Sequence, residues 1–147
     1  MNPSLLNDVK ITRVAIAAVA AQTDIDGDIL DMAGYEGVVF IAKLGDVTDT
    51  SALELLAQQN DANSTSGMAS LAGSAAFTAG ASSADDMLLV LDVYRPRERY
   101  VRPKLKRGTA NAVVSGIVAI QYGARKLPQS QGSTVVASAT LVEPAEA

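Results

Sequence analysis

The sequence contains no cysteine, no histidine and no tryptophan, and only 4% of its residues are aromatic. Without cysteine, the chain cannot form a disulfide, a thiol nucleophile or a thiolate metal site. Without histidine, it lacks the base that most serine and cysteine nucleophiles need and the commonest metal ligand. Few aromatic side chains disfavour a surface that stacks sugars or bases. The composition therefore predicts a protein that is not an enzyme and binds no metal or cofactor.

Long apolar runs are also missing. The most apolar early run, Val14–Ala21, has 8 residues, whereas a membrane-spanning helix needs about 20. The first residues, MNPSLLNDVK, do not combine a basic start with an apolar stretch, so no secretory signal is expected. Hydrophobic residues make up 48% of the 147 residues and charged residues 19%, which suffices for the core of one domain. We expect one domain with no membrane partner, made in a cytoplasm-like compartment.

Charge is distributed unevenly along the chain. The net charge of −4 is the balance of −10 in residues 1–94, +8 in residues 95–126 and −2 in residues 127–147. The positive charge is concentrated in Arg95–Arg107, the sequence RPRERYVRPKLKR. We call this segment the basic block. Its function depends on where the acids of residues 1–94 lie in the fold.

The basic block has three possible functions. Its bases can pair with acids of the same chain, Asp92 and Glu98 among them, or they can contact an acidic surface on a partner. Nucleic acid is the least favoured partner, because the isoelectric point is about 4.7 and Tyr100 is the block's one aromatic residue. The candidate contact residues for a neighbouring subunit or a partner are Arg95, Arg97, Arg99, Arg102, Lys104, Lys106 and Arg107.

Several runs have the length and composition of β-strands. The clearest are Val38–Leu44, Met87–Tyr94, Arg99–Lys106 and Ala112–Tyr122. The first two are apolar throughout or nearly so, which predicts burial on both faces. Pro103 suggests that its strand lies at a sheet edge, and Gly116 suggests a bulge or a close backbone approach.

Other segments are ambiguous or polar. Lys10–Ala21 and Ser51–Gln59 contain good helix formers, but strands and turns surround them, so we predict strands. Asn60–Gly67 and Thr78–Asp86 are predicted loops, and Thr134–Val142 is either a last strand or an arm over a neighbour. The pattern predicts an all-β sandwich of about eight antiparallel strands.

The acidic motifs do not form a recognisable active site. Asp24–Asp28 resembles the start of a calcium loop, but its glycine and final ligand fall at the wrong positions, so we interpret it as a turn between strands. Asp85 and Asp86 lie in a polar loop. Asp92 interrupts an apolar strand, and we expect a base from the basic block to neutralise it.

Three segments carry a resemblance to a known family. They are YEGVVFIAKLG at Tyr35–Gly45, the AQQ and polar loop at Ala57–Gly67, and LLVLDVYRPRERYVRPKLKRGTANAVVSGIVAIQYGARKLP at Leu88–Pro128. The chain resembles the capsid decoration, or cement, proteins of tailed phages and related small virion structural proteins. Their genes usually lie beside the gene of the major capsid protein.

The resemblance implies a jelly-roll-like β-sandwich that forms oligomers and binds the outer capsid shell without catalysis. The expected partners are the major capsid protein and the chain itself, as a homodimer or homotrimer. The expected location is the capsid exterior, after assembly in the cytoplasm of a bacterial host. The sandwich would fill one domain, residues 1–147, with an N-terminal arm at about residues 1–9 and an extended tail at about residues 129–147.

Two other functions remain open. The first is a head–tail connector or tail component of the virion. The second is a polysaccharide hydrolase that uses carboxylates on a β-sandwich.

Overall fold

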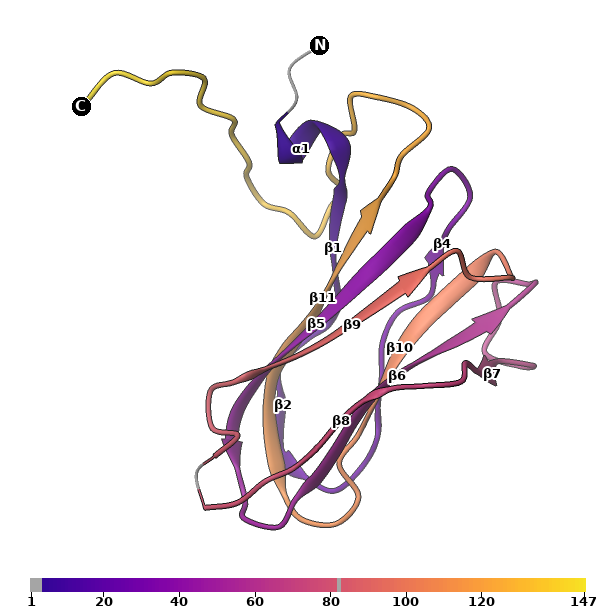
Figure 1. Ribbon diagram of the computed structural model, residues 1–147, viewed down its shortest axis with the longest axis vertical. Coiled ribbons are helices and arrows are strands. Elements are labelled where there is room, and N and C mark those ends of the chain that lie inside the picture. The colour runs from indigo at the N-terminus through magenta and orange to yellow at the C-terminus, as the bar shows by residue number, and fades with distance from the viewer. Residues whose placement is uncertain (1–3, 82) are drawn as a thin grey trace.

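The computed structural model describes residues 4–81 and 83–147, which form two antiparallel sheets packed face to face (Figure 1). Sheet A contains β1 (Lys10–Ala15), β2 (Ala18–Ala21), β5 (Gly37–Val47), β9 (Leu88–Tyr94) and β11 (Ala112–Tyr122). Sheet B contains β3 (Ile25–Asp26), β4 (Leu30–Asp31), β6 (Ala52–Asn60), β7 (Ala69–Ser70), β8 (Ala75–Thr78) and β10 (Tyr100–Lys106). A short helix, α1 (Leu5–Asp8), precedes β1 within the predicted N-terminal arm, whose residues 1–3 lie outside the described part.

Several short strands share one position in a sheet. β1 and β2 pair with consecutive parts of β11, β3 and β4 with β10, and β7 and β8 with β6. Numbered along the chain, the eight resulting positions follow the order 1-8-3-6 in sheet A and 2-7-4-5 in sheet B. This is the order of a jelly roll. The prediction of an all-β, jelly-roll-like sandwich of about eight antiparallel strands is therefore confirmed.

The core lies between the two sheets and follows the alternation of the strands. Every second residue of β5, β6, β10 and β11 points inward and is almost completely buried. The inward set includes Val38, Phe40, Ala42, Leu44, Leu53, Leu55, Ala57, Val101, Pro103, Leu105, Ile117 and Ala119. The segments predicted as strands against their helix propensity, 10–21 and 51–59, do form strands. The sandwich buries most of β6, and β1 and β2 pair with β11 at the edge of sheet A, where Val14 is buried.

The expectation that two strands are buried on both faces is wrong. β5 buries one face and leaves the other half-buried, and β9 exposes its outer residues, with Leu88 56% and Val90 51% exposed. A two-layer sandwich gives each sheet only one inner face, so a strand that is apolar on both faces must expose one of them. The apolar outer face of β9 therefore needs an explanation other than packing within this chain.

Pro103 does not mark an edge strand. β10 lies inside sheet B, between β6 and the pair β3 and β4. The Pro103 carbonyl accepts a hydrogen bond from the Gly27 backbone N at 2.9 Å, in the break between β3 and β4. The two backbone polar groups of a strand residue point to the same side, so the missing N–H of Pro103 faces this break and interrupts no ladder. Gly116 lies at a register shift of β11, as predicted.

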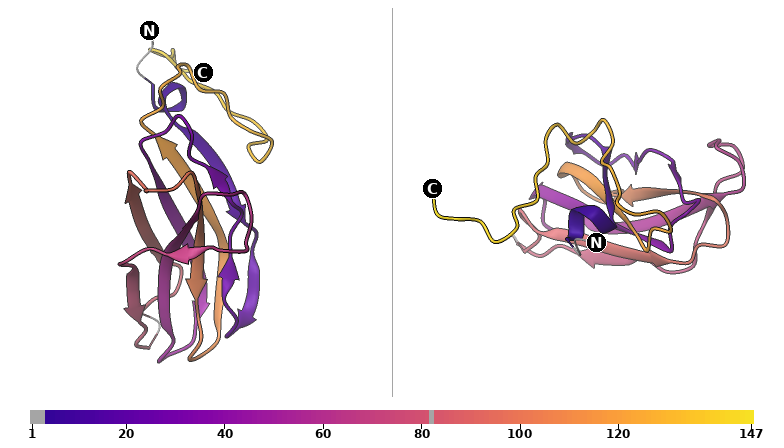
Figure 2. Two further views of the ribbon diagram at one scale, coloured as in Figure 1. Left: turned by 90° about the vertical axis from the view of Figure 1, so that its right-hand side faces the viewer. Right: turned by 90° about the horizontal axis from the view of Figure 1, so that it is seen from above.

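The first described residues, with α1, and the C-terminal tail lie at the same end of the sandwich (Figure 2). The tail follows the free edge of β1, where Gln131 Oε1 accepts from the Ile11 backbone N at 2.7 Å and Thr134 Oγ1 accepts from the Arg13 backbone N at 3.0 Å. Residues 134–142 form no strand, so of the two possibilities for this segment the structure shows an extended arm. From Val136 onward every residue is exposed.

Candidate interaction surfaces

Most of the basic block pairs with acids of the same chain. Four of its bases contact carboxylates that all belong to residues 24–36. The pairs, with their N–O distances, are Arg95–Glu36 at 3.0 Å, Arg99–Asp31 at 2.8 Å, Arg102–Asp26 at 3.9 Å, Lys104–Asp24 at 3.6 Å and Lys104–Asp26 at 3.5 Å. Much of the charge separation seen along the sequence is therefore neutralised in space.

Strand register produces most of these pairs. β10 lies beside β4 and β3, so Tyr100 is opposite Asp31 and Lys104 is opposite Asp26. Cross-strand neighbours on one face lie about 4.5–5.5 Å apart at their Cβ atoms, within reach of oppositely charged side chains. Within residues 4–81 and 83–147, Arg97 and Lys106 are the two members of the candidate contact set that are exposed and make no ion pair.

The expected partners Asp92 and Glu98 do not form ion pairs with these bases in the described part of the chain. Asp92 Oδ1 instead accepts a hydrogen bond from the Tyr122 hydroxyl at 2.5 Å. The two residues share the outer face of sheet A, on β9 and β11, with β5 between them. Burial and this hydrogen bond raise the pKa of the Tyr122 hydroxyl above its ordinary value, so Asp92 is satisfied by a neutral donor.

Arg107 corrects the predicted contact set. Its residue exposure is 3%, and its guanidinium donates to the backbone carbonyls of Val19 at 2.7 Å, Thr23 at 2.8 Å and Ala112 at 2.5 Å. It therefore joins β2 and the segment after it to the start of β11. Burial lowers the pKa of the guanidinium. The structure therefore shows Arg107 in contacts within its own chain, away from the exposed surface where a partner was predicted to bind it.

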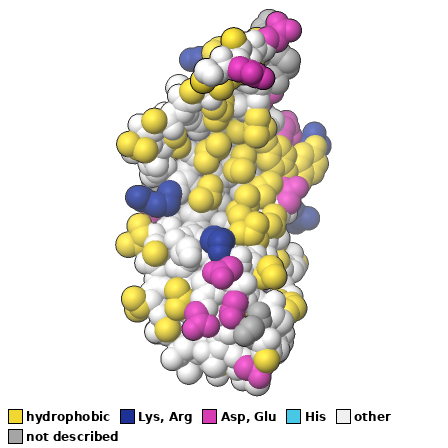
Figure 3. Space-filling view, turned by 90° about the vertical axis from the view of Figure 1, so that its left-hand side faces the viewer, with side chains coloured by type: hydrophobic (Ala, Val, Ile, Leu, Met, Phe, Trp, Pro, Cys, Tyr) yellow, Lys and Arg dark blue, Asp and Glu magenta, His cyan; other side chains and the backbone are white. Residues whose placement is uncertain are grey.

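Apolar side chains gather over part of the outer face of sheet A, and Lys, Arg, Asp and Glu side chains lie on the rest of this face (Figure 3). Strand register places Ile41 between Val90 and Val118, and Val39 beside Ile120. The apolar members of this outer face are Ile11, Val39, Ile41, Leu88, Val90, Val118 and Ile120. Single exposed apolar residues are ordinary, but a contiguous patch on a sheet marks a contact surface. The sequence signal for this surface was the lack of alternation in MLLVLDVY.

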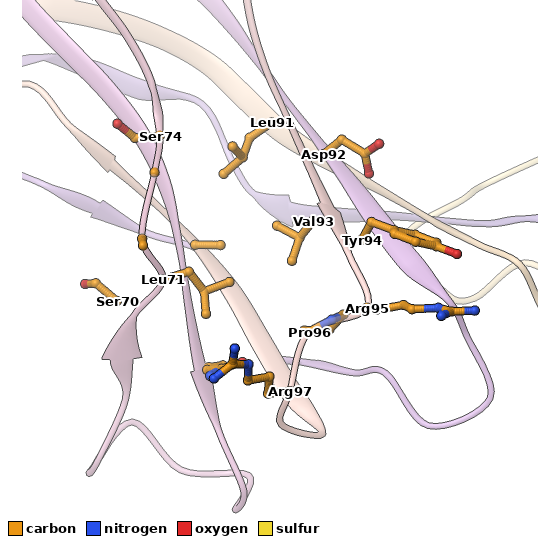
Figure 4. Close-up of a pocket in the computed structure, with 14 residues that line it drawn as sticks. Ser70, Leu71, Ser74, Leu91, Asp92, Val93, Tyr94, Arg95, Pro96 and Arg97 are labelled. Atoms are coloured by element: carbon orange, nitrogen blue, oxygen red, sulfur yellow. The ribbon is translucent and has the colours of Figure 1, made fainter.

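A groove of about 610 Å³ lies beside β9, where the two sheets separate. Leu91 and Val93 of β9 point into it toward Leu71, while Asp92 and Tyr94 point away (Figure 4). Arg97 also lines it. Sequence reasoning named Arg97 but did not predict the groove, because the segments that form it are distant in sequence.

The acidic side chains serve structural contacts. Asp24 and Asp26 both face the Lys104 ammonium, Asp85 Oδ1 accepts from the Val47 backbone N at 2.9 Å, and Asp86 lies 3.6 Å from Lys43. In the described ranges, no three acidic side chains gather into a possible metal site. No helix of this part of the chain is long and apolar enough to cross a membrane.

Comparison with known proteins identifies the fold alone. No family model matches the chain, and no curated protein matches it. Among solved structures, the chain is similar to the PBSX exported protein XepA, with a TM-score of 0.52 and 16% sequence identity. The alignment covers 97% of this chain and 46% of that protein, so the chain spans less than half of its length.

Proposed function

We propose that the protein is a non-enzymatic phage virion component that binds the outer capsid shell and stabilises it. The sequence resemblance to decoration proteins and the structural similarity to a protein of the phage PBSX support this proposal. The major capsid protein is then the partner, and the capsid exterior is the location. A protein that binds only the assembled shell stabilises that shell by its binding free energy, multiplied over many equivalent sites.

The observation that carries the proposal is the apolar outer face of sheet A. Its apolar residues lie on β1, β11, β5 and β9, and no segment of the described chain covers its centre (Figure 3). An apolar face of this kind suits a permanent contact with another protein, because the apolar core of an interface supplies most of the binding energy. Catalysis would require convergent acid and base groups, whereas the aspartates considered for that role hold structural contacts.

The experiment compares binding of face variants to capsid shells that lack this protein. The double variant Ile41→Thr with Val118→Thr keeps a β-branched side chain at both positions but removes apolar surface at the centre of the face. We expect shell occupancy to fall at least tenfold at a fixed protein concentration, with little dependence on salt. Val19→Thr is the matched control, because Val19 is 82% exposed on β2. Equal occupancy by the double variant, at an unchanged melting temperature, overturns the proposed contact.

The basic block supplies a second arm of the same experiment. Charge reversal at Arg97 and Lys106, the two exposed bases without an acid partner among the described residues, tests the contact predicted from the sequence. If the shell contact uses them, occupancy falls and salt lowers it further. Particles also distinguish the remaining functions. Occupancy over the whole shell is decoration, confinement to one vertex indicates a connector, and polysaccharide cleavage indicates a hydrolase.

A further inference from the structure

The outer edge of β9 is an unpaired strand edge. β9 pairs with β5 on one side only, and no strand in residues 4–81 or 83–147 pairs with its other side. Met87 O accepts from Leu44 N, and Arg95 N donates to Glu36 O, so the odd-numbered residues direct their backbone groups toward β5. The backbone groups of Leu88, Val90, Asp92 and Tyr94 therefore point to the free edge. Such an edge is a template for an additional strand.

The groove beside this edge has the properties of a receptor for alternate side chains. Leu91 and Val93 face into it from β9, and Leu71 faces them from the connection between β7 and β8 (Figure 4). Its lining is therefore apolar along the strand. Arg97, which lacks an acid partner in the described chain, lines the groove just after β9 ends. A strand added here would place every second side chain in the groove.

The C-terminal tail of the chain has the properties of a strand that could add to the free edge of β9. Beyond Thr134, the last residue that bonds to β1, the tail reads VVASATLVEPAEA and makes no strand. Its apolar residues are fully open to solvent, with Val136 101% exposed, Leu141 75% and Val142 66%. These residues include three valines, which favour strands. Exposed apolar and β-branched residues of this kind are suited to burial against the surface of a partner.

We propose that residues 136–143 of one copy add as a strand to the free edge of β9 in a second copy, with alternate side chains in the groove. The proposal does not depend on which partner the face of sheet A binds. It accounts together for the open edge, the groove, the unpaired Arg97 and the exposed tail.

Charge selects the direction of the added strand. Acidic Asp85 and Asp86 precede β9, and basic Arg95 and Arg97 follow it. Arg95 is paired with Glu36, so Arg97 is the base at this end without an acid partner among the described residues. A tail parallel to β9 brings its acidic end, Glu143 and Glu146, to the basic end of β9, whereas an antiparallel tail brings it to the aspartates.

Register then follows from the alternation. With Glu143 beside Arg95, Leu141 lies beside Val93 and Ala139 beside Leu91. Leu141 and Ala139 then face the groove, as Val93 and Leu91 do (Figure 4). On the opposite face, Ser138 lies beside Val90. The contact is heterologous, because one surface gives a strand and a different surface receives it. When repeating this contact from copy to copy returns to the first copy, the copies form a closed ring. When two copies exchange their tails, they form a dimer.

The first experiment removes the donor. We expect the full chain to be oligomeric by sedimentation velocity, and the chain ended after Val135 to be monomeric with an unchanged far-ultraviolet circular dichroism spectrum. A synthetic peptide of residues 134–147 should bind the shortened protein. The same peptide with Leu141→Asp should bind at least tenfold more weakly. A monomeric full chain, or an oligomer that survives the truncation, overturns the proposal.

The second experiment tests the receiving site by cross-linking. The chain has no cysteine, so an introduced pair reports a single contact. Val90→Cys with Ser138→Cys should form disulfide-linked oligomers on oxidation, because neighbouring strands bring such pairs within disulfide range. Val19→Cys with Ser138→Cys, the matched control, should not. Efficient cross-linking of Val90→Cys alone would instead show that two β9 edges pair with each other, and would overturn the proposal.

A charge exchange tests the direction. Arg97→Glu in the shortened protein should weaken binding of the peptide about tenfold, and a peptide with Glu143→Lys and Glu146→Lys should restore it. Weakening without restoration, or no weakening, contradicts the parallel arrangement.

Discussion

The Arg99 guanidinium holds the Asp31 carboxylate in a two-bond contact, with Nε 2.9 Å from Oδ1 and Nη2 2.8 Å from Oδ2. Asp31 ends β4, and Arg99 immediately precedes β10. The planar fork of arginine matches a carboxylate in this geometry. The pair therefore joins β4, one of the shortest strands of sheet B, to the start of β10.

Acid should weaken this pair in a defined direction. The hydrogen bond from Arg99 lowers the pKa of the Asp31 carboxyl below its ordinary value. A lowered folded-state pKa means that the contribution to stability is present above the unfolded-state pKa and is lost as the pH falls through the lowered value. We expect Asp31→Asn to lower the melting temperature slightly at neutral pH and to flatten its fall below pH 4. The effect is small because both side chains are about half exposed. If the melting temperatures of the two proteins fall by the same amount as the pH is lowered through this range, the prediction is wrong.

Arg107 should be the basic residue on which the fold depends most. Arg107→Met keeps much of the side-chain volume but removes the donors to the carbonyls of Val19, Thr23 and Ala112. Buried acceptors without donors are costly, so we expect a loss of about 3 kcal/mol in the free energy of unfolding. Lys106→Met is the neighbouring control, and it should change stability by less than about 0.5 kcal/mol because Lys106 is exposed. Urea denaturation measures both, and equal losses would contradict the assignment.

The contrast between Arg107 and Lys106 shows what the sequence could not supply. Both end the same basic block, and local sequence treats them alike. Arg107 is buried because β2 and the segment after it contact its guanidinium, although these residues are more than 80 positions away in the sequence. The unequal charge of the two halves was visible, but which acid meets which base depends on the register of β10 against β3 and β4.

Strand positions were more predictable than strand environments. Ala112–Tyr122 has the predicted bounds, because its composition and flanking turns are local signals. The apolar run at β9 was correctly predicted as a strand and wrongly predicted as buried on both faces. Periodicity does not state how many layers cover a sheet. The groove beside β9 and the open face of sheet A therefore required the three-dimensional arrangement.

Tyr122 should make stability sensitive to alkali. Its raised pKa means that folding favours the neutral phenol, so this contribution is present below the unfolded-state pKa of about 10 and declines as the pH rises above it. Tyr122→Phe removes the hydrogen bond to Asp92 and should cost about 1 kcal/mol at neutral pH. It should also remove part of the alkaline decline. Chemical denaturation at neutral and alkaline pH measures both effects. A decline of the same size in the variant would show that other groups cause it.

Gly116 should tolerate no side chain. Its φ is +142°, and an added Cβ would lie 3.0 Å from the Ala15 carbonyl oxygen of β1. The register of β11 against β5 shifts at this residue, so the backbone cannot move without disturbing both neighbours of β11. We expect Gly116→Ala to cost about 2 kcal/mol, from the strained φ together with the close contact. Gly108→Ala is the matched control, because an added Cβ there meets nothing within 4 Å, and its melting temperature should stay near that of the unmodified chain. If the two variants have the same melting temperature, the bulge at Gly116 is not held by this contact, and β1 must be able to move away from β11.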